Sequence, residues 1–138
     1  MDQRAIGEYA FRQYLQEGKL MGSRCAACGA QFVPPRDLCG ACRDGTMEWV
    51  AMSGLGTLAA FTSIAIGTPA TVAEGYHRDN PYCCAVVALE EGPRVVGRLS
   101  GVAARQPETI HIGLAVRAVL EPREDAAEGP TALVFQPR

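Results

Sequence analysis

The first apolar pattern along the chain is that of a helix. Between residues 4 and 17, apolar side chains recur every three or four positions and fall on one side of a helix. They are Ile6, Ala10, Phe11, Tyr14 and Leu15. At about 100° per residue this sector covers about 180°, more than a minimal core-facing stripe, and Tyr9 lies outside it. We expect the helix to end at Gly18 and part of the sector to face a second surface. The alternative is that Phe11 and Leu15 only close a small core.

After residue 53 the pattern changes to that of strands. Short β-branched and apolar runs follow one another without helical periodicity. These runs are 57–66, 82–89, 94–99, 115–121 and 131–137. Five such strands predict a small closed barrel, for which the OB-fold is the common solution, and Glu90–Pro93 is a hairpin turn. The connection 67–81 is long enough to be functional, whereas 121–130 is predicted to be a charged, solvated loop.

Two C-x-x-C pairs precede the strands and predict a metal site. They are Cys25 with Cys28, followed by Gly29, and Cys39 with Cys42. Each pair forms a tight turn that presents two thiolates, so this spacing is typical of one tetrahedral site. The alternatives are two disulfides, which a cytoplasmic protein disfavours, or four buried thiols. We expect one zinc ion, with rubredoxin-type iron as its rival, and a closed site that is structural rather than catalytic.

The two remaining cysteines, Cys83 and Cys84, lie in a predicted strand. Neighbouring residues of a strand point to opposite faces, so these thiols cannot serve one site. We expect them to pack in the core as small hydrophobic residues. A nucleophilic cysteine with His77 or His111 as its base is the alternative, and no nearby motif supports it.

The charge balance gives no sign of a nucleic-acid-binding surface. The chain has 13 Lys and Arg against 15 Asp and Glu, a formal net charge of −2, and Lys19 is its single lysine. No apolar run approaches the roughly 20 residues of a membrane helix. The N-terminal residues also lack the apolar segment of a signal peptide. We expect a cytoplasmic protein that binds neither nucleic acid nor a membrane.

Several short motifs follow one another in an order that carries a family resemblance. They are Gly18-Lys19-Leu20, the two cysteine pairs with Pro34-Pro35-Arg36 between them, Trp49, Ser53-Gly54-Leu55-Gly56-Thr57, Pro81-Tyr82, Leu89-Glu90-Glu91-Gly92 and Ile112-Gly113. Together they cover almost the whole chain and resemble the family catalogued as domain of unknown function 35. One departure is Gly40, where many members have proline, and it should not affect ligation.

The resemblance implies a mainly β fold in three parts. An N-terminal helical segment would occupy residues 1–22 and a rubredoxin-like four-cysteine zinc ribbon residues 23–50. A five-stranded OB-fold barrel would follow over residues 51–138.

The resemblance also implies a non-catalytic role in acyl-CoA metabolism. Members of the family pair with thiolase-fold enzymes, such as lipid-transfer-type thiolases and aldolases, or with MaoC-type hydratases. They are thought to help bind or channel the acyl-CoA in lipid, steroid or polyketide-type metabolism. We therefore expect a hetero-oligomer. Guanidinium groups suit the phosphates of coenzyme A, and the candidate contacts are Arg24, Arg36, Arg78 and Arg98.

We expect the protein to dock through its N-terminal helix and the zinc ribbon, with Tyr9, Phe11 and Tyr14 as the aromatic contacts. The alternative function is single-stranded nucleic-acid binding, because OB-folds and zinc ribbons both occur in such proteins. Phe61 and Tyr82 could then stack bases, but the net charge speaks against it. A third possibility is an enzyme in its own right, for which the sequence offers no paired carboxylates and no Ser/His/Asp motif.

Overall fold

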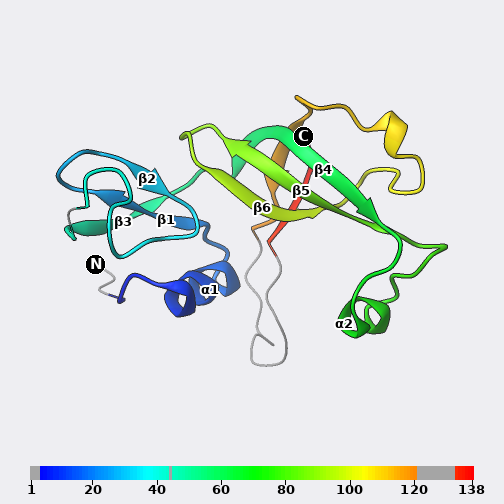
Figure 1. Cartoon of the computed structure of the whole chain (residues 1–138), viewed down its shortest axis with the longest axis horizontal. Coiled ribbons are helices and arrows are strands. Elements are labelled where there is room, and N and C mark those ends of the chain that lie inside the picture. The colour runs from blue at the N-terminus through cyan, green and yellow to red at the C-terminus, as the bar shows by residue number, and fades with distance from the viewer. Residues whose placement is uncertain (1–3, 44, 121–132) are drawn as a thin grey trace. The chain divides into compact units, whose positions relative to one another are not determined.

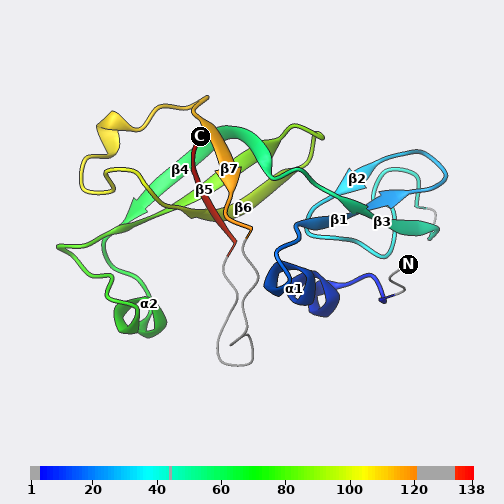
Figure 2. The same cartoon turned by 180° about the vertical axis from the view of Figure 1, so that it is seen from behind.

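The structure, a computed structural model, describes residues 4–43, 45–120 and 133–138. The chain forms two compact units, whose elements Figures 1 and 2 show from opposite sides. The first unit contains the chain up to Gly54 and also Leu89–Val95. The second contains Leu55–Ala88, Val96–Val119 and the C-terminal residues. Among the described residues, no helix is long and apolar enough to cross a membrane.

A three-stranded antiparallel sheet forms the centre of the first unit, in the order β2-β1-β3. Its strands are β1 (Met21–Cys25), β2 (Gln31–Phe32) and β3 (Met47–Ala51). Neighbouring chain approaches Gly22 so closely that a Cβ there would lie 2.5 Å from the Phe32 carbonyl oxygen. Only glycine fits at this position. The buried Ser23 follows it and lies opposite both Phe32 and Trp49.

The N-terminal helix α1 (Glu8–Gln16) is shorter at its start than the predicted 4–17. Gly7 precedes it with an extended backbone and no side-chain cap, and glycine is a poor helix former. At the other end Gly18 has a φ of +84°, as expected. The N–H of Gly18 donates to Leu15 O at 3.0 Å and that of Lys19 to Tyr14 O at 2.8 Å. This bonding is a Schellman motif, which satisfies the last carbonyls of the helix.

The apolar side of α1 is covered by its own unit. Tyr14 meets the Trp49 ring edge-on, with ring centroids 5.0 Å apart, and is only 2% exposed. The indole N–H of Trp49 donates to the Arg4 carbonyl at 2.8 Å, and the Arg4 guanidinium lies 4.3 Å from the centre of the Tyr14 ring. Phe11 is 9% exposed, whereas Tyr9 is 79% exposed. Two of the three predicted docking residues, Phe11 and Tyr14, are therefore core residues, and that prediction now rests on Tyr9.

Five strands close into a barrel in the second unit, in the order β4-β5-β6-β8-β7. They are β4 (Leu55–Ile64), β5 (Tyr82–Leu89), β6 (Arg94–Leu99), β7 (Ala115–Ala118) and β8 (Val134–Pro137). β6 and β8 run parallel, while β7 pairs antiparallel with both β4 and β8. This is a five-stranded Greek-key barrel, so the predicted OB-fold is confirmed.

Alternation along β5 determines which of its residues fill the barrel. Cys83, Ala85, Val87 and Leu89 are buried, and the residues between them are half-buried. The two thiols thus face opposite sides, as predicted. Cys83 packs in the core, whereas Cys84, which was also expected there, is only half-buried. Gly97 on β6 makes room for the fully buried Phe135, because a Cβ at Gly97 would lie 2.9 Å from that ring.

The connections differ more from expectation than the strands do. The bounds of β5 and β6 match the predicted runs, while β4 begins two residues earlier and β7 ends at Ala118. The long connection 67–81 contains a short helix, α2 (Pro69–Ala73), whose N-cap Thr68 accepts from the Thr71 N–H at 3.3 Å. A 3₁₀ turn, η1 (Pro107–Thr109), precedes β7. The predicted charged loop 121–130 lies outside the described residues.

Candidate metal centre and barrel cleft

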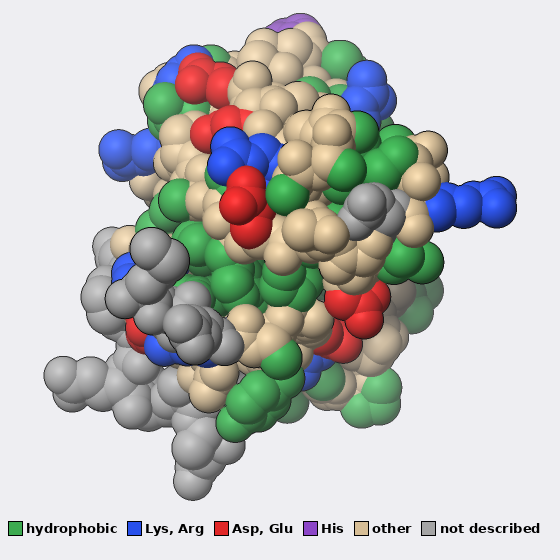
Figure 3. Space-filling model, turned by 90° about the vertical axis from the view of Figure 1, so that its left-hand side faces the viewer, with side chains coloured by type: hydrophobic (Ala, Val, Ile, Leu, Met, Phe, Trp, Pro, Cys, Tyr) green, Lys and Arg blue, Asp and Glu red, His purple; other side chains and the backbone are tan. Residues whose placement is uncertain are grey.

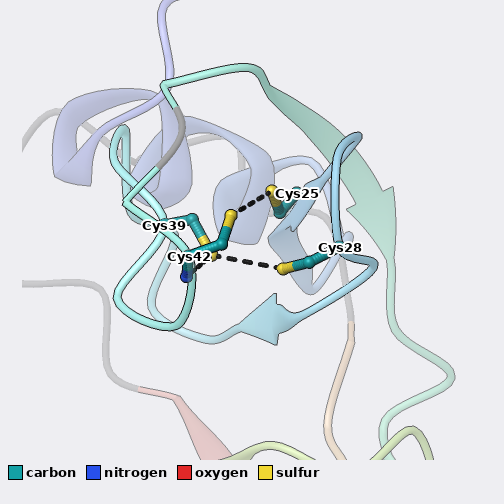
Figure 4. A group of neighbouring side chains, drawn as sticks. All are labelled: Cys25, Cys28, Cys39 and Cys42. Atoms are coloured by element: carbon teal, nitrogen blue, oxygen red, sulfur yellow. Dashed lines mark hydrogen bonds between the residues drawn. The ribbon is translucent and has the colours of Figure 1, made fainter.

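The four cysteines of the two C-x-x-C pairs come together in the first unit. Figure 4 shows their side chains pointing toward a common centre, and all four sulfur atoms lie within 4.8 Å of one another. Cys25 Sγ lies 3.5 Å from Cys42 Sγ, and Cys28 Sγ lies 3.5 Å from Cys39 Sγ. Each short contact joins one pair to the other. The two pairs therefore build one site, and none of the four is in a disulfide.

Local backbone geometry turns each pair toward this centre. Cys25 ends β1, and Gly29 follows the first pair with a φ of +81°, a conformation that glycine adopts without strain. Arg43 follows the second pair and takes a φ of +63°. In this second turn the N–H groups of Ala41 and Cys42 both donate to Cys39 Sγ at 3.4 Å.

Those N–H groups favour the thiolate form of Cys39. Hydrogen bonds from Cys42 and then Ala41 outweigh desolvation and lower the pKa of Cys39 to about 6. A metal ligand must be deprotonated, so the turn prepares this cysteine for coordination before any ion arrives.

The donor set fits a zinc ion. With Zn–S bonds of about 2.3 Å, tetrahedral geometry separates the sulfur atoms by about 3.8 Å. The two short contacts of 3.5 Å and the upper bound of 4.8 Å bracket that value. Four thiolates fill the coordination sphere and leave no position for a substrate or water. The predicted site is thus one structural zinc site.

Zinc has a clear structural task in this unit. Its sheet strands contain five, two and five residues, which bury little apolar surface by themselves. Beyond the metal, the Arg36 N–H donates to the buried Ser23 Oγ at 2.8 Å and fastens the segment between the two cysteine pairs to β1. Ligation therefore supplies part of the folding free energy of this unit.

The four predicted arginines are divided between the two units. Arg24 and Arg36 belong to the first unit, whereas Arg78 and Arg98 belong to the second. Arg24 pairs with Glu48 at 2.6 Å, and both side chains are about half-exposed. The guanidinium of Arg36 lies 5.6 Å from the centre of the Phe32 ring.

Two of the four arginines line cavities: Arg36 lines one of about 550 Å³ in the first unit together with the acidic Asp37, and Arg98 lines a cleft in the second unit. The cleft has a volume of about 700 Å³ and is lined from residues 76–83 and 98–106. Arg98 Nη1 donates to Glu74 Oε2 at 2.8 Å, and its guanidinium lies 5.2 Å and 5.1 Å from the ring centres of Tyr76 and Tyr82. Arg78 is exposed and does not line this cleft.

Arg98 keeps its positive charge in the cleft because its pKa is raised. Burial by itself would lower its pKa, but the hydrogen bond and charge of Glu74 outweigh burial, and the pKa of Arg98 is raised. The guanidinium therefore stays charged in the cleft. Sequence reasoning missed Arg105 and Tyr76, which line the same cleft, because the barrel brings together segments that no local motif connects.

Cys83, one of the two thiols considered as a nucleophile, is poorly suited to that role. Cys83 is fully buried, and burial raises its pKa above the ordinary thiol value, which disfavours a reactive thiolate. His77 and His111 are both exposed. The Nδ1 atom of His77 accepts from the Asp79 N–H at 3.2 Å within its own turn.

Surface charges also bear on the nucleic-acid alternative. On the face shown in Figure 3, the basic and acidic side chains of the described residues are interspersed. Opposite charges also pair with one another among the described residues, as Arg24 does with Glu48 and Arg12 with Glu8. A continuous positive groove, which single-stranded nucleic acid requires, is not formed by the described residues on that face.

The fold and the site place the chain in a class of proteins that combine a four-cysteine zinc ribbon with an OB-fold barrel. Family comparison agrees with both halves. Residues 12–48 match "ChsH2, rubredoxin-like zinc ribbon domain", and residues 49–121 match "ChsH2, C-terminal OB-fold domain". The chain therefore belongs to the ChsH2 family, whose relatives carry the name DUF35, and the resemblance noted from the sequence is confirmed.

Two archaeal relatives share the name "DUF35 domain-containing scaffold protein". That of Methanothermobacter thermautotrophicus is 34% identical over 91% of this chain and 90% of its own length. That of Methanocaldococcus jannaschii is 31% identical over 80% of this chain and 74% of its own length. A "Probable enoyl-CoA hydratase alpha subunit" from Thermomonospora curvata is 34% identical over 73% of this chain but only 29% of its own length.

Solved structures are similar over nearly the whole chain. One chain of an "Ltp2-ChsH2(DUF35) aldolase" is 26% identical, with a TM-score of 0.75 and coverage of 99% of this chain and 98% of that one. A DUF35 protein from Sulfolobus solfataricus has a TM-score of 0.63 at 18% identity and covers 94% of this chain and 84% of that one. The second similarity concerns the fold alone.

Proposed function

We propose that this protein is a non-catalytic accessory subunit of an acyl-CoA enzyme. It would dock on a thiolase-fold enzyme, such as a lipid-transfer-type thiolase or aldolase, or on a MaoC-type hydratase, and help bind or channel the acyl-CoA. The observation that carries this proposal is the end-to-end similarity to one chain of the Ltp2-ChsH2(DUF35) aldolase.

The geometry of the metal centre supports the non-catalytic part of the proposal. Catalytic zinc keeps an open coordination position, and the four thiolates here leave none. The relatives named scaffold proteins support the same role, since a scaffold acts by holding another protein.

Acyl-CoA as the substrate class is supported by the name of one relative and by one cleft in this chain. The hydratase-named relative acts on an enoyl-CoA by its name, and this chain covers less than a third of it. Within this chain the proposal needs a place for an anionic ligand. Among the four arginines predicted for it, Arg98 lines the cleft of the second unit.

Co-expression with a thiolase-fold or MaoC-type enzyme from the same organism tests the proposal. We expect the two chains to elute together in size-exclusion chromatography, because a stable complex buries at least about 1,200 Å². The enzyme should turn over its acyl-CoA faster with this chain than without it. The zinc-loaded chain alone should turn over none.

Two results would contradict the proposal. In one, the chain elutes separately and leaves the rate of the enzyme unchanged. In the other, the isolated chain cleaves or hydrates an acyl-CoA at an enzyme-like rate. Tight binding of single-stranded oligonucleotides by the isolated chain would instead favour the nucleic-acid alternative.

A further inference from the structure

The cleft of the second unit has the dimensions and lining of a small-molecule site. Its volume of about 700 Å³ falls within the range of about 300–1,000 Å³ that ligand pockets occupy. Apolar walls from Pro81, Leu99 and Val102 alternate with polar side chains from Asn80 and Ser100. Sites that orient one ligand usually combine a mainly apolar surface with a few polar groups that point toward the ligand.

Charge in the lining is of one sign. Arg98 and Arg105 both line the cleft, and no aspartate or glutamate is among the described residues that do. This contrasts with the chain as a whole, whose formal net charge is −2. Glu74, which does not line the cleft, neutralises part of the charge of Arg98. Its carboxylate accepts a hydrogen bond from one of the two terminal nitrogens of that guanidinium. A guanidinium carries five N–H donors, so donors remain for an anion.

Aromatic rings adjoin the same charge. Tyr76 and Tyr82 lie with ring centroids 5.2 Å apart and planes tilted by 54°, and Arg98 is near the faces of both. Contacts with two rings limit the rotamers of a side chain that would otherwise be mobile, so less entropy is lost when it binds. Rings beside a fixed cation are suited to a ligand that combines a flat group with an anion.

Hydrogen bonds hold both walls of the cleft in place. On one side Ser63 Oγ of β4 donates to the Ala104 carbonyl at 2.6 Å, directly before Arg105. On the other side Asn80 Nδ2 donates to the Gly75 carbonyl at 2.9 Å. The site is therefore largely formed before a ligand enters, as is usual for ligand pockets.

We propose that this cleft binds a phosphorylated nucleotide, with Arg98 and Arg105 on its phosphates and a tyrosine ring on its base. Coenzyme A carries such a nucleotide at one end, and free adenine nucleotides share the chemistry. The preference for coenzyme A rests on the proposed function, whereas the nucleotide class rests on the cleft itself.

Nuclear magnetic resonance of the ¹⁵N-labelled, zinc-loaded full chain tests this proposal. The probes are coenzyme A, adenosine 3′,5′-bisphosphate, ADP and pantetheine. We expect saturable shifts from the amides of residues 98–106 with coenzyme A and the bisphosphate, and none with pantetheine, which lacks the nucleotide. Tighter binding of coenzyme A than of ADP would identify coenzyme A as the source, and the reverse would identify free nucleotides.

Variants of the two arginines test their roles. Arg105→Gln and Arg98→Gln should each weaken binding about tenfold or more, because each removes charge-assisted hydrogen bonds to a phosphate. The matched control is Arg78→Gln, which removes the same charge from an exposed site in the same unit and should change nothing. Arg98→Gln also removes contacts with Glu74 and the tyrosines, so a loss of binding in that variant can come from a changed cleft. Arg105→Gln is therefore the variant that decides the test.

The proposal is overturned if no nucleotide causes saturable shifts, if the shifts lie outside the cleft, or if Arg105→Gln binds as tightly as the wild type. It is also overturned if an oligothymidylate occupies the cleft more tightly than every mononucleotide. These outcomes are independent of the accessory role. A chain that binds no nucleotide but elutes with its enzyme retains the role and loses the cleft site. A chain that binds nucleotide but joins no enzyme keeps the cleft site and loses the accessory role.

Discussion

Replacing Tyr14 by alanine should lower stability, whereas replacing Tyr9 by alanine should leave stability unchanged and weaken docking. Both tyrosines lie on α1, but Tyr14 is 2% exposed and Tyr9 is 79% exposed. Truncating a buried aromatic side chain costs about 3–5 kcal/mol, which includes the contact with Trp49. Tyr9→Ala should change the free energy of unfolding by less than about 0.5 kcal/mol. If α1 docks through Tyr9, this variant should instead bind the partner enzyme more weakly.

Urea unfolding followed by tryptophan fluorescence measures the difference directly. Trp49 is the single tryptophan of the chain and lies against Tyr14, so its emission reports on the first unit. Zinc concentration must be the same in every sample, because bound metal adds to apparent stability. Tyr14→Phe keeps the ring and should recover most of the loss, which guards against Tyr14→Ala being unfolded from the start.

Two results would refute the reasoning. One is a loss below about 1 kcal/mol for Tyr14→Ala, which is too small for a buried ring in a packed contact. The other is a comparable loss for Tyr9→Ala, which would mean that Tyr9 is buried in solution. A Tyr9→Ala variant that is stable and binds the partner enzyme with full affinity would remove the last residue of the predicted docking surface.

Three further predictions concern the metal, the barrel and the thiols. Cys39→Ser should lower the zinc content measured by elemental analysis and loosen the first unit, because it removes one of four ligands. Cys83→Ser should keep one zinc per chain. A red, iron-containing protein would contradict zinc as the ion. Gly97→Ala should destabilise the barrel by about 1–3 kcal/mol because the new Cβ meets the Phe135 ring. The control is Gly7→Ala, whose new Cβ meets nothing within 4 Å and should cost no stability. Equal melting temperatures for the two variants would refute the prediction. In the zinc-loaded protein at pH 8 an alkylating reagent should modify Cys84 before Cys83, because burial raises the pKa of Cys83 and excludes the reagent; mass spectrometry that finds Cys83 modified first would show that β5 opens.

Local spacing is why the metal site could be predicted completely. The geometry of a C-x-x-C turn depends on four consecutive residues, and a short connection brings the two turns together. The bounds of β5 and β6 were likewise predictable, since a hairpin turn fixes which residues pair and alternation fixes which side is buried.

Helix α1 and the cleft show what local patterns leave open. Periodicity identified the apolar side of α1 but not its partner, and the structure places Trp49, thirty-five positions after Tyr14, against that side. The cleft depends on similarly distant residues, because Tyr76, Arg98 and Arg105 meet only through barrel closure. An arginine chosen for its chemistry alone therefore could not be separated from one that pairs on the surface, as Arg24 does with Glu48.

The two units are stabilised by different means, and this makes their proposed roles separable. The first unit has strands of at most five residues and depends on zinc, whereas the barrel closes around a core of its own that contains Leu58, Val87, Val116 and Phe135. Removing zinc with a chelator should therefore impair docking through α1 before it impairs nucleotide binding in the cleft. If zinc removal abolished both at once, the two units would unfold as one cooperative structure, and neither role could be assigned to a unit by mutation alone.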